Sequence, residues 1–167
     1  MEHIKTIADG LFEKYRTRNP FKVIEGEGIR LCYNFEFADI KGFYAVINGS
    51  RNIVINGNLD DSLKKIVAAH ELGHDLLHRE LAGNSALYET ALFDLCARPE
   101  YEANLFAADF LIPDEEVLKA AEEGLSSFEA AAELFSDVRL FSIKLKSMNN
   151  RGYKLNIGMD IESDFLR

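Results

Sequence analysis

Apolar residues recur at helical intervals in some segments of the chain and gather in dense runs in others. Residues 2–18 predict a helix with one apolar stripe, which Asn19-Pro20 ends. Residues 21–57 predict strands, because the runs 29–37 and 43–47 are rich in aromatic and β-branched side chains. The turn signal Asn48-Gly49-Ser50 then predicts a β-hairpin over residues 43–56.

The second part of the chain predicts mainly helices. They are expected over residues 60–79, 99–111, 114–123, from 126 onward and 137–148, with a strand at 153–157. Pro99 suits the first turn of its helix, and Ser126 with Glu129 forms a capping box. Strands followed by helices indicate an α+β fold with a short antiparallel sheet.

Composition narrows the class of protein. A chain of 167 residues with 47% hydrophobic residues fits one domain with a small appendage. The net charge of −9 argues against direct nucleic-acid binding. Cys32 and Cys96 are too few for a disulfide framework. Because no long apolar run and no secretory signal are visible, we expect no membrane span and a cytoplasmic location.

An HExxH motif, His70-Glu71-Leu72-Gly73-His74, lies on the long predicted helix. Residues four apart differ by about 40° around a helix and about 6 Å along it, so the two histidines can meet one metal ion. Neutral imidazole is a good ligand for Zn²⁺. Glu71 is rotated by about 100° from His70, which sets it beside the metal. The pattern therefore predicts a zinc site with Glu71 as the catalytic base.

The surroundings of the motif favour this interpretation. Leu63, Ile66 and Leu77 lie within about 60° of His70 on the helix, so both histidines fall in the buried stripe. Asp75 and Arg79 lie on the opposite face, which we expect to be solvated. The alternative, two core histidines satisfied by hydrogen bonds, explains less well why a Glu directly follows the first.

A catalytic zinc ion needs a third protein ligand and an open position for water. On the helix after Pro99, Glu102 lies at the edge of an apolar arc, where a carboxylate needs a partner. We therefore expect Glu102 to be the third ligand, and the alternative is an exposed helix charge. Asp109 projects within about 20° of Glu102, two turns later, and is expected to hydrogen-bond behind the ligands.

The two motifs HELGHDLLH (70–78) and EANLFAADFLIP (102–113) resemble those of the ImmA/IrrE-type metallopeptidases. The resemblance covers roughly residues 15–115. It implies a zincin-like (gluzincin) core with two active-site helices, zinc bound by His70, His74 and Glu102, and Glu71 as the base. It also implies a substrate class, helix-turn-helix transcriptional repressors, and an association with mobile elements.

Other residues are candidates for the cleft. The oxyanion that develops during peptide hydrolysis normally receives a second hydrogen-bond donor. Tyr88, Tyr101 and His78 are candidates, and the sequence does not choose among them. The strand 52–55 is expected to align an extended substrate by edge pairing.

The chain divides into a predicted peptidase core, residues 1–113, and a helical C-terminal extension, residues 114–167, with a winged-helix-like outline. Five basic residues and no acidic ones occur between positions 139 and 154 of the extension: Arg139, Lys144, Lys146, Arg151 and Lys154. Contact with DNA is one interpretation and a solvated basic face is the other. Because the net charge opposes nucleic acid, we expect this run to serve contact with a protein partner or packing.

Two further function classes compete with a zinc endopeptidase. The first is a zinc-containing module that relieves repression by sequestering the repressor without cutting it. The second is a regulator with a structural zinc, which would need a fourth ligand from Cys or His. His3, Cys32 and Cys96 are the spare candidates, and none has helpful spacing.

Overall fold

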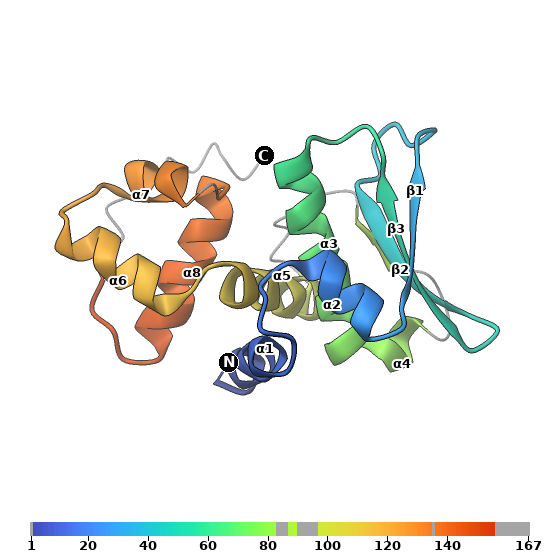
Figure 1. Cartoon of the computed structure of the whole chain (residues 1–167), viewed down its shortest axis with the longest axis horizontal. Helices are drawn as coiled ribbons and strands as arrows, with labels where there is room; N and C mark the ends of the chain where they lie inside the picture. The colour runs from blue at the N-terminus through green and yellow to red at the C-terminus, as the bar shows by residue number, and fades with distance from the viewer. Residues whose placement is uncertain (1, 83–86, 90–96, 135, 156–167) are drawn as a thin grey trace.

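The computed structural model describes residues 2–155 except 83–86, 90–96 and 135. Its elements are α1 (Glu2–Tyr15), α2 (Pro20–Gly26), β1 (Arg30–Asn34), β2 (Gly42–Ile47), β3 (Ser50–Asn56), α3 (Asp61–Leu77), α4 (Arg79–Ala82), β4 (Leu87–Glu89), α5 (Arg98–Leu111), α6 (Asp114–Glu122), α7 (Ser127–Glu133) and α8 (Val138–Asn150). The sheet lies at one end, α6–α8 at the other, and α3 and α5 lie between them (Figure 1). The fold is mixed α+β, as expected.

The helix α2 was not expected from the sequence. Asn19-Pro20 ends the first helix, but it also begins the second. The Asn19 side chain accepts a hydrogen bond from the Phe21 backbone N–H at 3.0 Å, and Pro20 occupies the first turn. Asn as N-cap followed by Pro is a helix start signal. The prediction of strands from residue 21 onward is therefore wrong over residues 21–26, which belong to α2.

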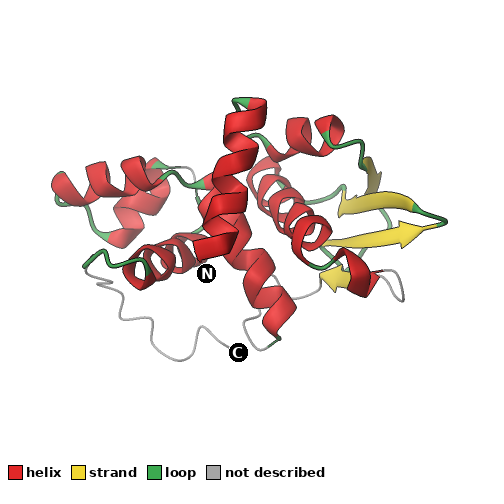
Figure 2. Ribbon diagram, turned by 90° about the horizontal axis from the view of Figure 1, so that it is seen from below, coloured by secondary structure: helices red, strands yellow, loops and turns green. Residues whose placement is uncertain are grey.

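The sheet has the strand order β1-β3-β2-β4 and gathers at one end of the molecule (Figure 2). The predicted hairpin is confirmed, because β2 and β3 pair antiparallel. β1 pairs parallel with β3, so the sheet is mixed and the expectation of a purely antiparallel sheet is wrong. β3 has a partner on both sides, so its residues 52–55 are not an edge at which a substrate can pair, contrary to the prediction.

The middle of α3 is buried on all sides. Each residue from Ile66 to Asp75 is buried, because one side of the helix packs on β2 and β3 and another on α5. A Cβ placed on Gly73 would lie 3.1 Å from Cδ1 of Phe106 and 3.2 Å from Cα of Ala103. Only a residue without a side chain fits this contact without movement of its neighbours. Gly73 therefore permits the close approach of α3 and α5.

Asp75 lies in the interior, and the expectation that it is solvated is wrong. Its carboxylate is fully buried and accepts hydrogen bonds from Tyr44 Oη at 2.8 Å, from Arg51 at 2.9 Å and from Arg79 at 3.0 Å. Burial and the neighbouring carboxylate raise the pKa of the Tyr44 hydroxyl well above its usual range. Because Tyr44 and Arg51 lie on β2 and β3, Asp75 anchors α3 to the sheet.

The C-terminal helices α6, α7 and α8 form as predicted, including the capping box of Ser126 and Glu129. Residues 153–155 form no strand, and residues 156–157 lie outside the described part of the chain. The division into two domains and the winged-helix-like outline stay predictions.

Of the five basic residues of the extension, Lys144 is buried and Arg151 is partly buried, whereas Arg139, Lys146 and Lys154 are exposed. Lys144 is fully buried, and its Nζ lies 2.8 Å from Asp109 and 2.5 Å from Asp114. Arg151 also pairs with Asp114 at 2.5 Å, and Arg139 pairs with Asp137 at 2.7 Å. The contacts of Lys144 and Arg151 tie α8 to α5 and to the start of α6. They favour a packing role for Lys144 and Arg151, and partner contact by the three exposed basic residues stays a prediction.

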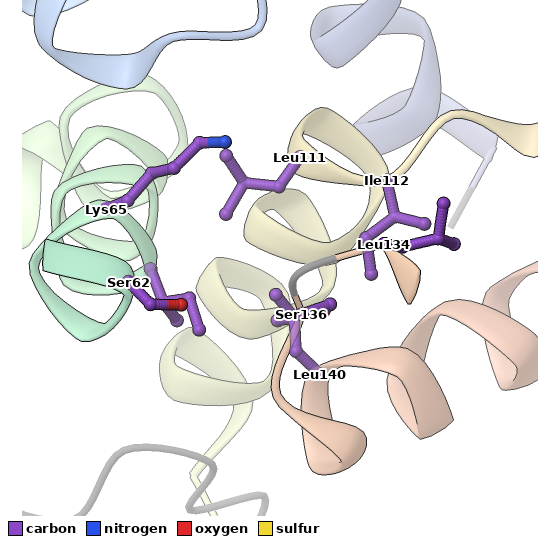
Figure 3. Close-up of a pocket in the computed structure, with 8 residues that line it drawn as sticks. Ser62, Lys65, Leu111, Ile112, Leu134, Ser136 and Leu140 are labelled. Atoms are coloured by element: carbon purple, nitrogen blue, oxygen red, sulfur yellow. The ribbon is translucent and has the colours of Figure 1, made fainter. Parts of the chain in front are cut away.

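A cavity of about 20 Å³ lies where α3, α5 and α8 meet (Figure 3). Ser62, Lys65, Leu111 and Leu140 are among the residues that line it. A space of this size holds about one water molecule, so it offers no room for a substrate. Among the described helices, none is both long and apolar enough to cross a membrane.

The buried ion pair yields the first prediction. Lys144→Met should lower the free energy of unfolding by about 3–5 kcal/mol, because it leaves the fully buried carboxylate of Asp109 without its nearest cation. Lys146→Met, two residues away and exposed, is the matched control and should change it by less than about 0.5 kcal/mol. Urea denaturation measures both. Equal effects of the two substitutions would contradict the internal role of Lys144.

Candidate metal centre

Three side chains from α3 and α5 converge on one point. Nε2 of His70 and Nε2 of His74 are 3.0 Å apart. Oε2 of Glu100 lies 3.2 Å from the first of these atoms and 3.4 Å from the second. Both histidines are buried and Glu100 is partly exposed. Two imidazole nitrogens and one carboxylate oxygen thus form a triangle with nearly equal sides.

This triangle fits a tetrahedral zinc ion. Ligand atoms at about 2.0–2.1 Å from such an ion lie roughly 3.3 Å from one another. The three observed distances, 3.0, 3.2 and 3.4 Å, bracket that value. Two histidines and one glutamate are also a donor set typical of catalytic zinc, which keeps its fourth position open. The group can therefore hold a metal ion with little rearrangement.

Electrostatics around the triangle suit a cation. Burial lowers the pKa of His74, so its ring is neutral at pH 7, as metal binding requires. Burial alone would raise the pKa of Glu100, but the contacts with His70 and His74 outweigh it and hold that pKa well below its usual range. Glu100 is therefore an ionised carboxylate. A partly buried negative charge next to two neutral imidazoles is a setting that a divalent cation stabilises.

Asn104 orients the first histidine. Its Oδ1 atom lies 3.1 Å from Nδ1 of His70, and both side chains are buried. An amide oxygen only accepts, so Nδ1 of His70 carries the proton and donates it. In the neutral ring Nε2 then presents its lone pair to the triangle. A histidine ligand oriented by a hydrogen bond from its second nitrogen is usual in metal sites.

The structure brings Glu100, rather than the predicted Glu102, to the two histidines. Oε2 of Glu102 lies 3.0 Å from Nε2 of His78, and Oε1 accepts a hydrogen bond from Arg98 at 2.8 Å. His78 and then Arg98 lower the pKa of Glu102 against the opposing effect of burial. Glu102 is therefore placed behind the triangle, in contact with His78. The assignment of metal ligands itself stays a prediction.

The positions of Glu100 and Glu102 around α5 explain why the sequence alone did not identify Glu100 as a candidate metal ligand. Relative to Ala103 on the buried face of α5, Glu100 is rotated by about 60° and Glu102 by about 100° in the opposite sense. Both carboxylates thus border the apolar arc. The spacing of Glu100 and Asn104, four residues apart, put them on one face, and this was the available signal. Only the position of α3 decides which side of the arc faces the histidines.

Glu71 is buried beside β2. A Cβ on Gly42 would lie 3.1 Å from Oε1 of Glu71 and 2.6 Å from Cγ1 of Val67. The carboxylate therefore contacts the backbone of β2 at the one position where no side chain intervenes. Gly42 pairs with Glu89 of β4, so the edge of the sheet runs next to Glu71.

The remaining candidates occupy other places. His78 lies at the end of α3, with Nδ1 3.2 Å from Nδ1 of His74. The Tyr101 ring lies 5.8 Å from Nζ of Lys146, on the side of α5 that faces α8, which favours a packing role. Asp109 bonds to Lys144 and Ser147 and is therefore not behind the triangle, contrary to expectation. The backbone of Tyr88 lies in β4, but its side chain is outside the described part.

The spare metal ligands do not join the triangle within the described residues. His3 is exposed on α1, and Cys32 is exposed on β1, which forms the edge of the sheet opposite to β4. Cys96 lies outside the described residues. Within the described residues, the cluster that could hold a metal ion consists of His70, His74 and Glu100.

Comparison with known proteins gives two matches. The family model for the IrrE N-terminal-like domain, Peptidase_M78, matches residues 24–136. The chain is also similar to the "Uncharacterized immunity region protein 2" of Bacillus phage phi105. The two are 36% identical over 111 residues, which is 66% of this chain and 69% of the relative. The region that the family model matches contains the HExxH motif, Glu100 and all of α5.

The triangle yields a prediction that separates the two glutamates. Purified protein should hold about one zinc ion per chain, and Glu100→Gln should lose it, because the neutral amide is a poor zinc ligand. Glu102→Gln is the matched control and should still bind one equivalent when zinc is saturating. Elemental analysis after dialysis against zinc-containing buffer, followed by desalting, measures both. Loss of metal in Glu102→Gln alone would restore Glu102 as the ligand.

Proposed function

Because the chain belongs to the Peptidase_M78 family of IrrE N-terminal-like domains, we propose that it is a zinc-dependent endopeptidase with Glu71 as its catalytic base. The observation that carries the proposal is the triangle of His70, His74 and Glu100, with the buried carboxylate of Glu71 one residue after the first ligand. Family membership supports the reaction class, and the donor set supports the metal.

The residues divide the chemistry between them. A zinc ion in this triangle supplies Lewis-acid polarisation of the scissile carbonyl and lowers the pKa of a water to about 7. Glu71 accepts the proton of the attacking water and passes it to the leaving amine. Its burial against β2 restricts where the carboxylate can turn. Asn104 fixes the ring of His70, so that this ligand needs no reorientation when the metal binds.

The edge strand β4 is the proposed docking strand for the substrate. Among the described strands, β4 pairs with β2 on one side and is the last strand of the sheet on the other. An extended peptide that adds to such an edge gains main-chain hydrogen bonds. Since Glu89 of β4 is opposite Gly42, which contacts Glu71, the added peptide would run past the base. This replaces the earlier expectation for the central strand β3.

We further propose that the substrate is a helix-turn-helix transcriptional repressor. The similarity to a phage protein whose name refers to an immunity region supports a role in control of a mobile element. Sequestration of the repressor without cleavage is the competing function. It needs no base, whereas the buried carboxylate of Glu71 directly after His70 and a donor set typical of catalytic zinc support cleavage.

Glu71→Gln separates cleavage from sequestration. The variant should keep its metal, because Glu71 is not among the three converging ligands, and should lose cleavage by roughly 10²–10⁴-fold, because the general base is removed. The assay is co-expression with helix-turn-helix proteins encoded beside the gene of this chain, with cleavage scored by intact mass. Glu80→Gln, an exposed residue of α4, is the control. Unchanged relief of repression by Glu71→Gln, with the repressor intact, would favour sequestration.

A further inference from the structure

A row of four polar side chains connects the candidate metal centre to the surface. Nε of Arg98 donates to Oε1 of Glu102 at 2.8 Å. Oε2 of the same carboxylate lies 3.0 Å from Nε2 of His78. Nδ1 of His78 lies 3.2 Å from Nδ1 of His74. The row runs from Arg98 at the start of α5 to His78 at the end of α3, and its last member is His74, a candidate metal ligand.

The outer end of the row fixes the direction of each hydrogen bond. Arg98 is a permanent cation that only donates, and an ionised carboxylate only accepts. Glu102 therefore accepts from Arg98 with one oxygen and from Nε2–H of His78 with the other. With its proton on Nε2, a neutral His78 has a lone pair on Nδ1. His74 must then carry its proton on Nδ1 and donate it to His78.

The direction of these bonds determines what His74 offers to the metal. With the proton on Nδ1, the neutral ring of His74 presents the lone pair of Nε2 to the triangle, 3.4 Å from Glu100. The same result holds for His70, where Asn104 fixes the proton on Nδ1. Each histidine thus has its own partner, Asn104 of α5 for His70 and His78 at the end of α3 for His74, and both rings are set in the ligating tautomer.

We infer that His78 and Glu102 are positioning residues that hold His74 in its metal-binding tautomer and orientation, so that a carboxylate–histidine–histidine relay supports the metal centre. The inference rests on the proposed metal site. In this arrangement Glu102 does not bind the metal directly. It orients His78, and His78 in turn orients the metal ligand His74. Partners of this kind typically account for 10–100-fold in metal affinity.

The structural role of His78 at the end of α3 can be separated from the role of its side chain. The helix end depends on the backbone N–H of His78, which donates to the carbonyl of His74 at 2.9 Å, and this bond does not need the imidazole. Side-chain substitutions therefore test the relay rather than the helix end. Asn at this position keeps an acceptor near the place of Nδ1, whereas Ala removes it.

The test measures zinc affinity of the full-length, metal-stripped chain by competition with a chromophoric chelator, together with the visible spectrum of the Co²⁺ form. His78→Ala and Glu102→Ala should each weaken zinc binding by about 10–100-fold and shift the Co²⁺ bands. His78→Asn should recover most of the affinity. Glu122→Ala, an exposed residue of α6, is the control and should match the wild type.

The outcomes separate this inference from the proposed function. Wild-type affinity and an unchanged Co²⁺ spectrum in both His78→Ala and Glu102→Ala would overturn the relay and leave the metal centre intact. Equal weakening by His78→Asn and His78→Ala would also overturn it, because the acceptor would then be irrelevant. A wild-type chain that takes up neither Zn²⁺ nor Co²⁺ would overturn the metal centre itself.

Discussion

The close contact of α3 with α5 is the constraint on which the candidate metal centre depends. The two histidines come from one helix, and Glu100 and Asn104 come from the other. Side chains this short meet only if the helix backbones approach closely, and Gly73 with Ala103 allows that approach. Gly73 lies between the two histidines in the sequence, so the motif carries both the ligands and the packing surface. A side chain at position 73 would push the two helices apart and separate the histidines from Glu100.

The position of α3 is fixed from its other sides as well. Asp75, directly after the second histidine, joins the helix to Tyr44 on β2 and Arg51 on β3. Its charge is buried, and three donors compensate it, which is the condition under which a buried carboxylate is tolerated. The helix is thus held between the sheet and α5. Sites on such rigid elements can keep ligands in place with little reorganisation when a metal ion binds.

Local signals in the sequence predicted the helices and the hairpin well, because caps and periodicity act over a few residues. The pair Asn19-Pro20 was misinterpreted, since it ends one helix and starts the next. Errors about the site have another cause. Asp75 and Lys144 look solvated on their own helices, and their partners Arg51 and Asp109 lie 24 and 35 residues away in the chain. The choice between Glu100 and Glu102 likewise depends on which side of α5 meets α3, and this is tertiary information. His70, Glu71 and His74 were recognisable because their chemistry is contained in five consecutive residues, although their roles stay predictions.

The central claim is that one metal ion is held by His70, His74 and Glu100 at the contact of α3 with α5. Diffraction from zinc-loaded crystals, measured on both sides of the zinc absorption edge, tests it directly. The account predicts one anomalous peak per chain, at about 2.0–2.2 Å from Nε2 of both histidines and an oxygen of Glu100. A peak bonded instead to Glu102 and His78, or no peak between α3 and α5, would contradict it.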